Sequence, residues 1–456
     1  MTPRTALATL LVALALAPST APAQPLGRLV ETGEAPWPEG ALGQPTPVDG
    51  TRPPSLGALR SMRAPVSVHL GPGVDARLAP RALSLAERTL DALEFTHRFP
   101  LPQPDGTRGG DPSLDLYLTA DGAPYETVVD ALDATWIWDR ASAFVRVRAT
   151  TEERLLARSI AEGIARAIVL GVKADHPPAF VAAMGASLGR MVTREPADLD
   201  ALRAFQSHPE RAFFGGAHDD LDGRGASLFL DLISAKWDDD SHKLLRALLW
   251  APVNRTAPGW ERLWDEPDVF DVARRMFRDE PDQLEGALME FAAARAVVGT
   301  AADPYDLAGV RDATLSTRPL RVLRYGELPQ RVWPAEMLEP TGSAVIEVNL
   351  DDAPLRASMG LWFHGSRWQR WMVRAIRVGR DGLAARELGS QVISDGEWSL
   401  QMDILDGYTR VLVVVLNLGD LGYEPDQPQS ANGFFVLNVG SGDPAPHDAS
   451  ANANAR

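Results

Sequence analysis

The residues with the clearest capacity for chemistry lie in the stretch 152–171. Glu162 stands midway between Arg158 and Arg166 at intervals of four residues, so on a helix the three side chains share one face. A carboxylate in this setting forms ion pairs, or it acts as a general base if a metal-bound water lies beside it. From these residues alone, the favoured interpretation of Glu162 is an ion pair on the helix surface with Arg158 and Arg166.

The apolar residues of the same stretch predict the helix that positions Glu162. Leu156, Ile160, Ile164 and Ile168 recur at every fourth residue, which makes one continuous apolar face. Gly171 is a typical residue at the end of a helix. The pattern predicts a helix that is mostly buried.

A second apolar helix is expected at 179–188, after a short loop that ends in Pro177-Pro178. This order of elements, preceded by strand-rich sequence, resembles the gluzincin-like zinc metallopeptidases, in particular secreted bacterial members with a C-terminal β-domain. In that family one helix bears His-Glu-x-x-His. The next helix bears Pro-x-Trp-x-x-Glu-Gly-x-Ala and supplies the third zinc ligand.

Only the general base of that family has a counterpart in this chain. The first motif falls on residues where Glu162 matches the glutamate, while Ala161 and Ala165 stand at the two histidine positions. The third ligand position falls on Ala183, or on Ala182 if the register shifts by one residue. The resemblance therefore implies a degenerate site in which every metal position is alanine.

Alanine at these positions has a chemical consequence. A catalytic zinc takes about three nitrogen or oxygen donors at about 2 Å, and a methyl group donates no electron pair. Arg224 also stands where the family has a tyrosine, just before the segment 225–232 that resembles the family's Gly-x-x-x-Phe-x-x-Tyr-Leu. We therefore expect no metal and no cofactor, and a pseudopeptidase that binds an extended peptide or a protein in the former active-site cleft.

Two other functions remain open on the sequence. The first is an active secreted hydrolase that takes unusual ligands from the acidic loop Asp219–Asp222, which His208 and His218 flank. A solvated acidic turn explains that loop equally well. The second is a carbohydrate-binding surface protein, because four tryptophans gather near the C-terminus, although core packing accounts for most of them; they are Trp362, Trp368, Trp371 and Trp398.

Composition narrows the class of partner. The 456 residues include 45 basic and 61 acidic ones, for a net charge of −16, which argues against nucleic acid or an anionic membrane surface as partner. The chain has no cysteine, so neither disulfides nor thiolate metal sites are expected. Oligomeric state is left undetermined.

The N-terminus predicts export. An apolar run over 6–17 is followed by Ala21-Pro22-Ala23, a typical cleavage site, so the mature chain is expected to begin at Gln24. The run is too short to span a bilayer. The expected location is therefore secreted or periplasmic, with no membrane span.

The remaining pattern predicts an α+β protein, with a zincin-like α/β and helical domain followed by an antiparallel β-sandwich. The sandwich is expected to fold on its own, because its short strands are joined by short turns. The predicted divisions are a signal peptide at 1–23, a disordered Pro-rich linker at 24–64, the peptidase-like domain at 65–300, a linker at 301–318, the β-sandwich at 319–440 and a disordered tail at 441–456.

Overall fold

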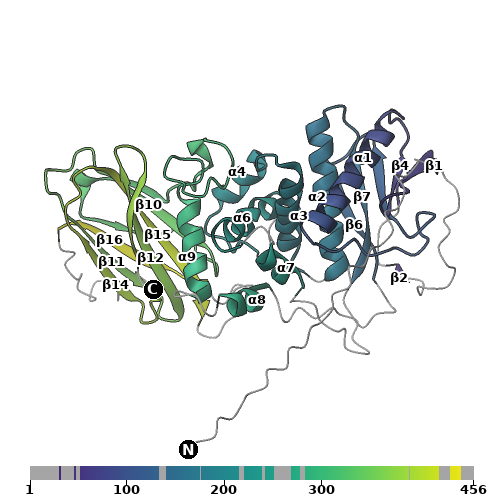
Figure 1. Cartoon of the computed structure of the whole chain (residues 1–456). Coiled ribbons are helices and arrows are strands. Elements are labelled where there is room, and N and C mark those ends of the chain that lie inside the picture. Colours follow the sequence, from purple (N-terminus) through teal and green to yellow (C-terminus); the bar gives the residue numbers. More distant parts are fainter. Residues whose placement is uncertain are drawn as a thin grey trace, which may run out of the picture.

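The computed structural model describes a mixed α+β protein. The described residues are 30–31, 46–47, 52–132, 140–174, 176–214, 220–238, 242–250, 269–277, 283–389, 391–420 and 432–442. A sheet lies at one end of an elongated molecule, helices lie in the middle, and two further sheets lie at the other end (Figure 1). The predicted signal peptide and most of the predicted tail lie outside the described residues.

The N-terminal sheet has seven strands in the order β1-β3-β4-β5-β7-β6-β2. Strands β4, β5 and β7 are parallel, and the strands toward both edges pair antiparallel. The stretches 66–70, 114–118 and 142–148, in which apolar and polar residues alternate, form β4, β5 and β7. The bounds are β1 Val30–Glu31, β2 Thr46–Pro47, β3 Gly57–Arg60, β4 Val66–Leu70, β5 Leu114–Thr119, β6 Tyr125–Leu132 and β7 Ala141–Arg148.

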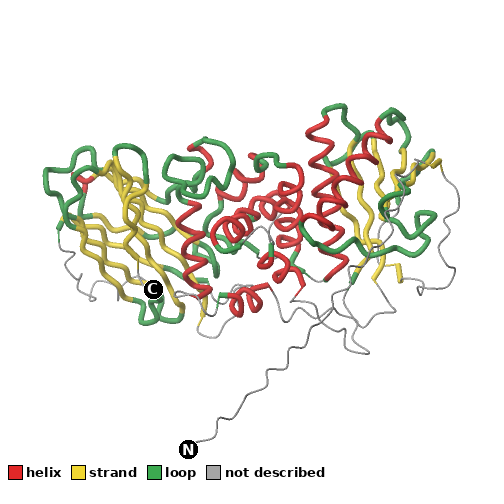
Figure 2. Tube along the Cα trace, viewed as in Figure 1, coloured by secondary structure: helices red, strands yellow, loops and turns green. Residues whose placement is uncertain are grey.

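One face of this sheet is apolar and is covered by helices α1 (Leu78–Asp91) and α2 (Glu153–Val172) (Figure 2). Val68 and Leu116 of the sheet belong to the same hydrophobic core as Ile160 of α2. The predicted helix at 152–171 agrees with α2 to within one residue at each end. The apolar face of α2 therefore points to the sheet and α1, as the four-residue period predicts.

The predicted linker at 24–64 differs from the structure over residues 52–64. Strand β3 pairs with β4 in the sheet, and the side chain of Arg52 enters a buried network. The prediction of a tether without a core is wrong for this part of the chain. This segment is rich in proline and glycine, and its four-residue strand is too short to show a clear alternation of apolar and polar residues. The sequence pattern therefore does not reveal the strand.

Seven further helices make up the middle of the molecule among the described residues. Their core is a group of phenylalanine rings packed edge to face or tilted; for example, the rings of Phe213 and Phe229 have centroids 4.7 Å apart. The bounds are α3 Pro178–Thr193, α4 Leu199–Ser207, α5 Asp220–Gly225, α6 Ser227–Lys236, α7 Lys243–Trp250, α8 Val269–Met276 and α9 Gln283–Arg295.

The C-terminal part contains a five-stranded sheet, β13-β12-β15-β10-β8, and a four-stranded sheet, β14-β11-β16-β9. All pairs are antiparallel except β10 with β8. Leu361 and Phe363 of one sheet share a core with Val373 and Val413 of the other. The bounds are β8 Arg321–Arg324, β9 Gln330–Val332, β10 Ser343–Asn349, β11 Met359–Gly365, β12 Gln369–Gly379, β13 Ala384–Gly389, β14 Glu397–Met402, β15 Tyr408–Asp420 and β16 Phe435–Ser441.

The other face of the five-stranded sheet is buried against the helical part. Met372, Leu412 and Val414 belong to the same core as residues of α9. Two ion pairs, Arg370–Glu285 and Arg374–Glu290, join the sheet to α9, each with a 2.9 Å N–O distance. This shared core does not fit a β-sandwich at 319–440 that folds independently.

The predicted linker at 301–318 is also packed rather than extended. Leu307, Ala308 and Leu315 are buried in the first core. The Asp303 carboxylate accepts hydrogen bonds from the backbone N–H groups of Tyr305 and Leu307, which orders the turn. Residues 301–318 therefore form part of the interface between the helices and the C-terminal sheets.

Candidate functional site

Helices α2 and α3 hold the positions where the family resemblance places metal ligands. The side chains of Ala161, Ala165 and Ala183 are each 0% exposed, and Ala182 is 2% exposed. All four contribute only methyl groups. None of them is chemically able to ligate a metal.

Two glycines set how α2 and α3 meet. A Cβ atom added to Gly185 would lie 2.5 Å from Cγ of Arg166, and one added to Gly189 would lie 2.6 Å from Cγ of Glu162. Later residues of α3 therefore meet earlier residues of α2, and the helices are antiparallel. The missing side chains let the backbone of α3 approach the charged face of α2.

Helical geometry then decides between the two possible registers of the third ligand position. At about 100° per residue, Ala182 lies within about 20° of Gly189 around the axis of α3. Ala183 lies about 160° away from Gly185, on nearly the opposite side of the helix. Of the two positions that the resemblance allows for a third ligand, Ala182 therefore lies on the side of α3 toward α2, and Ala183 does not.

Glu162 is buried instead of lying on the helix surface. The residue is 2% exposed, and its Oε2 accepts a 2.7 Å hydrogen bond from the Tyr125 hydroxyl. Nε of Arg224 donates to the same oxygen at 3.1 Å, while Arg158 lies 4.0 Å from Oε1. The predicted surface ion pair is thus wrong in its location, and the main partners come from elements far away in the sequence.

The two arginines near Glu162 have further acidic partners. Arg166 pairs with Asp220 at 2.5 Å rather than with Glu162, and Arg224 pairs with Asp198 at 2.7 Å. Both guanidinium groups lie over the Tyr125 ring, at 4.9 Å for Arg166 and 5.5 Å for Arg224. The acidic and basic groups of this cluster therefore neutralise one another.

The pKa values of Tyr125 and Arg224 keep both side chains protonated as hydrogen-bond donors. Burial, and next the charge of Glu162, raises the pKa of Tyr125 well above its usual value, so the phenol stays protonated and donates. Burial opposes the charge of Arg224, but Glu162 and the other acidic partners outweigh it and raise the arginine's pKa. Oε2 of Glu162 thus accepts two hydrogen bonds and has no free direction toward a substrate.

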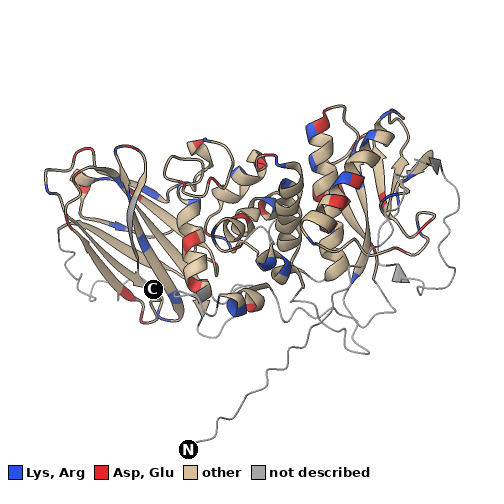
Figure 3. Ribbon diagram, in the orientation of Figure 1, with Lys and Arg blue, Asp and Glu red and all other residues tan. Residues whose placement is uncertain are grey.

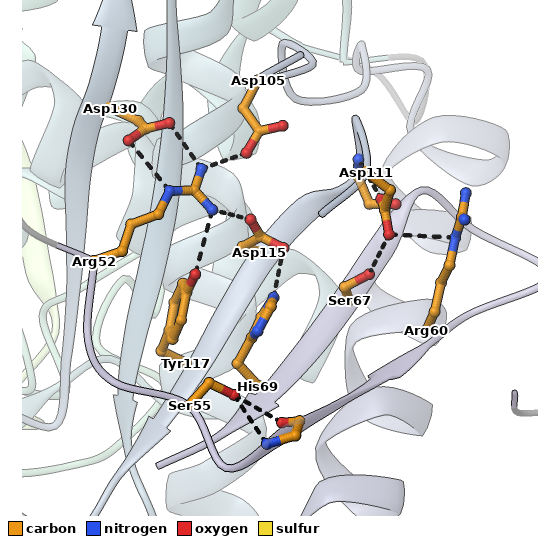
Figure 4. A network of polar contacts seen from close by, with 12 residues as sticks. Arg52, Ser55, Arg60, Ser67, His69, Asp105, Asp111, Asp115, Tyr117 and Asp130 are labelled. Atoms are coloured by element: carbon orange, nitrogen blue, oxygen red, sulfur yellow. Dashed lines mark hydrogen bonds and ion pairs between the residues drawn. The ribbon is translucent and has the colours of Figure 1, made fainter. Parts of the chain in front are cut away.

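A second buried polar network lies on the opposite face of the N-terminal sheet (Figure 4). Arg52 forms ion pairs with Asp105, Asp115 and Asp130, the last at 2.7 Å. The side chains of Asp115 and Asp130 are 0% exposed. One guanidinium therefore joins the N-terminal segment to strands β5 and β6 and to the loop that contains Asp105.

His69 of β4 extends this network. Its Nε2 lies 2.7 Å from Oδ1 of Asp115, and its ring stacks on Tyr117 with centroids 4.4 Å apart. Arg52 also donates to the Tyr117 hydroxyl at 3.3 Å. The histidine, the tyrosine and the aspartates thus form one continuous set of contacts with Arg52.

The network holds more acids than guanidinium groups can neutralise. Arg108 adds a second cation, 2.8 Å from Asp130. Burial, and next the charge of Asp115, raises the pKa of Asp105 to about 8. Asp105 therefore takes up a proton more readily than an isolated aspartate, which lowers the repulsion within the group of three aspartates.

The sequence contains a signal for this network, although none of its residues is among the predicted site residues. Ser67 and His69 alternate with valines in one strand, and Asp115 and Tyr117 alternate with leucines in the next. The two strands are parallel neighbours, and His69 pairs in register with Tyr117. Polar side chains on one face of two adjacent central strands indicate a polar cluster beneath a covering segment, here the one with Arg52.

The acidic loop considered as an alternative metal site is only partly within the described residues. His218 and Asp219 lie outside them, while Asp220 and Asp222 belong to helix α5. Asp222 lies 3.4 Å from Arg211. Among the residues that the structure describes, no group of three or more histidine or acidic side chains is arranged to hold a metal ion.

The four C-terminal tryptophans differ widely in exposure. Trp371 is 0% exposed and packs in the core between the two sheets, whereas Trp368 is 81% exposed. Trp362 and Trp398 are half-buried on β11 and β14. Core packing is therefore confirmed for Trp371 and does not account for Trp368.

Comparisons with known proteins give no relative: no family model and no curated protein matches this sequence. Within the described part of the chain, no helix has the length and apolar character needed to cross a bilayer. Basic and acidic residues are interspersed along the described helices, strands and loops (Figure 3).

Proposed function

We propose that this protein is a noncatalytic relative of the gluzincin-like metallopeptidases, with a zincin-like part and a C-terminal β-sandwich. In this proposal it acts as a peptide-binding or structural protein outside the cytoplasm. The sheet, the two central helices and the C-terminal strands follow one another in the order that the resemblance requires.

The observation that carries the proposal is the state of the former active-site helix. Methyl groups fill the positions equivalent to the metal ligands, and the one matching residue, Glu162, is bound by Tyr125 and Arg224. A general base needs a water or substrate proton within hydrogen-bond reach. A carboxylate that stabilises the contact between a strand and two helices supports a structural role instead.

Strand β6 supports the peptide-binding part of the proposal. In the family, an edge strand beside the active-site helix binds the substrate peptide in extended form. Here β6 is antiparallel to β7, and it contacts α2 through Tyr125 and through a 3.0 Å hydrogen bond from Thr127 to the carbonyl of Gly163. Its outer edge pairs with β2 only at Ala131 and Leu132 among the described residues, so the backbone of 125–130 is suited to strand addition.

Export rests on the N-terminal sequence pattern alone. The charged start, the apolar run and the cleavage site before Gln24 support a secreted or periplasmic protein. N-terminal sequencing of protein recovered from the cell exterior or periplasm tests this. We expect Gln24 as the first residue.

Metal content and peptide binding test the main proposal. Elemental analysis of the purified protein is expected to give well below one zinc per chain, and casein should not be cleaved. Hydrogen–deuterium exchange with a saturating library of random hexapeptides should protect the amides of 125–130. One tightly held zinc per chain, with casein cleavage that Glu162→Gln abolishes, would establish the active-hydrolase alternative instead.

A further inference from the structure

The outer face of the four-stranded sheet carries an aromatic side chain among polar ones. Along β11, Leu361 and Phe363 point into the core, so Trp362 points outward between them. Strand pairing places Ser399 of β14 on one side of Trp362 and Asn438 of β16 on the other. The indole is thus flanked by groups that donate and accept hydrogen bonds.

An open surface depression of about 360 Å³ shares Glu397 with this face. Its lining includes Asp395, Glu397 and Trp398, from the loop that leads into β14. Glu397 also belongs to the outer face, where it pairs across the strands with His364. The volume lies within the range of small-ligand sites, about 300–1,000 Å³.

The two carboxylates of this region already have polar partners. Oε1 of Glu397 lies 3.6 Å from His364 and 3.9 Å from Arg367, and Oδ1 of Asp395 accepts the backbone N–H of Glu397 at 3.2 Å. Together with Ser399 beside Trp362, these groups favour a ligand with many hydrogen-bonding groups.

We propose that this face and the depression bind a neutral oligosaccharide. One sugar ring would lay its C–H face on the indole of Trp362, while hydroxyl groups donate to the carboxylates of Glu397 and Asp395. A sugar ring combines an apolar face with polar edges, which matches an aromatic ring between polar side chains. The turn that follows β11 carries the exposed Trp368. The end of β11 also contacts the loop that contains Asp395, because the N–H of Gly365 donates to the carbonyl of Gly396 at 2.8 Å.

The test uses the full chain and a panel of cellohexaose, chitohexaose, xylohexaose and mannohexaose in titration calorimetry. At least one is expected to bind. Trp362→Leu should weaken its binding by about tenfold, as expected for loss of an aromatic contact, while Trp362→Phe should retain most of it. Trp250→Ala, in helix α7, is the control and should bind as the parent does.

Glu397→Gln provides a second variant that the fold tolerates, because the side chain is 48% exposed. It should also weaken binding of the same sugar. Absence of binding to all four sugars, or equal binding by the parent, Trp362→Leu and Glu397→Gln, would overturn the proposal. Binding of decalysine without any of the sugars would also overturn it and would indicate a basic peptide as the ligand. None of these outcomes depends on the zinc or casein results.

Discussion

The Tyr125 hydroxyl donates a 2.7 Å hydrogen bond to Glu162, and this bond joins the edge strand β6 to the centre of helix α2. Arg224 brings α5 to the same carboxylate. Three elements that are distant in the sequence therefore meet at the one side chain that matches the metallopeptidase pattern. The carboxylate serves the packing of these elements.

Glu162→Gln is expected to destabilise the protein by about 1.5–3 kcal/mol, because it removes the charge from a buried hydrogen-bonded carboxylate, while Arg224 keeps Asp198 as its other anionic partner. The double variant Glu162→Gln/Arg224→Gln should cost less than the sum of the single variants by about 1 kcal/mol or more. Urea unfolding followed by circular dichroism measures both. Glu153→Gln, at a side chain that is 64% exposed, is the control and should stay within about 0.5 kcal/mol of the parent. Additive effects would show that the two groups do not interact.

The register of α3 predicts which designed metal site works. Ala161→His/Ala165→His/Ala182→Glu should bind zinc more tightly than the parent, because Ala161 and Ala165 share one face of α2 and Ala182 lies on the side of α3 toward α2. The variant Ala161→His/Ala165→His/Ala183→Glu is the control, and its zinc affinity should increase less. Zinc titration calorimetry on variants that are folded by circular dichroism makes the comparison. Tighter binding by the Ala183→Glu variant would reverse the assigned register.

The raised pKa of Asp105 predicts that the stability difference between the parent and an Asp105 variant depends on pH. Its pKa is raised to about 8 in the folded protein, so between about 4 and 8 the folded state holds a proton that the unfolded state releases. This group therefore lowers stability as pH rises through that window. Asp105→Asn imitates the protonated acid. The melting temperature of the variant, relative to that of the parent, should therefore rise from pH 5 to pH 8. The exposed control Asp200→Asn should follow the parent, and parallel parent and Asp105→Asn curves would contradict the assignment.

His176 predicts the opposite slope in the acid range. Burial, and next the charge of Lys173, lowers the pKa of His176 to about 3, against an ordinary value near 6.5. Between those values the unfolded state takes up a proton and the folded state does not, so stability falls as pH drops from about 6.5 to about 3. His176→Phe should flatten the loss of melting temperature between pH 7 and pH 4. His208→Gln, whose side chain is 43% exposed, should keep the parent's slope; an equally steep loss in His176→Phe would exclude His176 as the cause.

The shared core predicts the behaviour of the C-terminal part alone. A fragment of residues 319–442 would expose Met372, Leu412 and Val414, which the intact chain buries against the helices. We expect this fragment to aggregate or to bind the dye ANS, and co-expression with residues 24–318 to restore solubility. Size-exclusion chromatography and ANS fluorescence are the measurements. A monomeric fragment that does not bind ANS would restore the boundary predicted from the sequence.

The sequence by itself determined the elements with strong periodicity. Apolar residues at every fourth position predict α2 to within one residue at each end. The alternation of apolar and polar residues predicts β4 with the bounds Val66–Leu70. Residues 411–416 are apolar without alternation, which is typical of a strand buried on both faces, and β15 is indeed buried on both.

Only the tertiary structure decided which groups meet. Tyr125 and Arg224 lie 37 and 62 residues from Glu162, and Arg52 lies 78 residues from Asp130. Local periodicity reports the direction in which a side chain points, because it depends on neighbours within a turn or a strand. It does not report which distant element lies in that direction. The sequence therefore determined the helix that holds Glu162, and the tertiary structure determined the partners of its carboxylate.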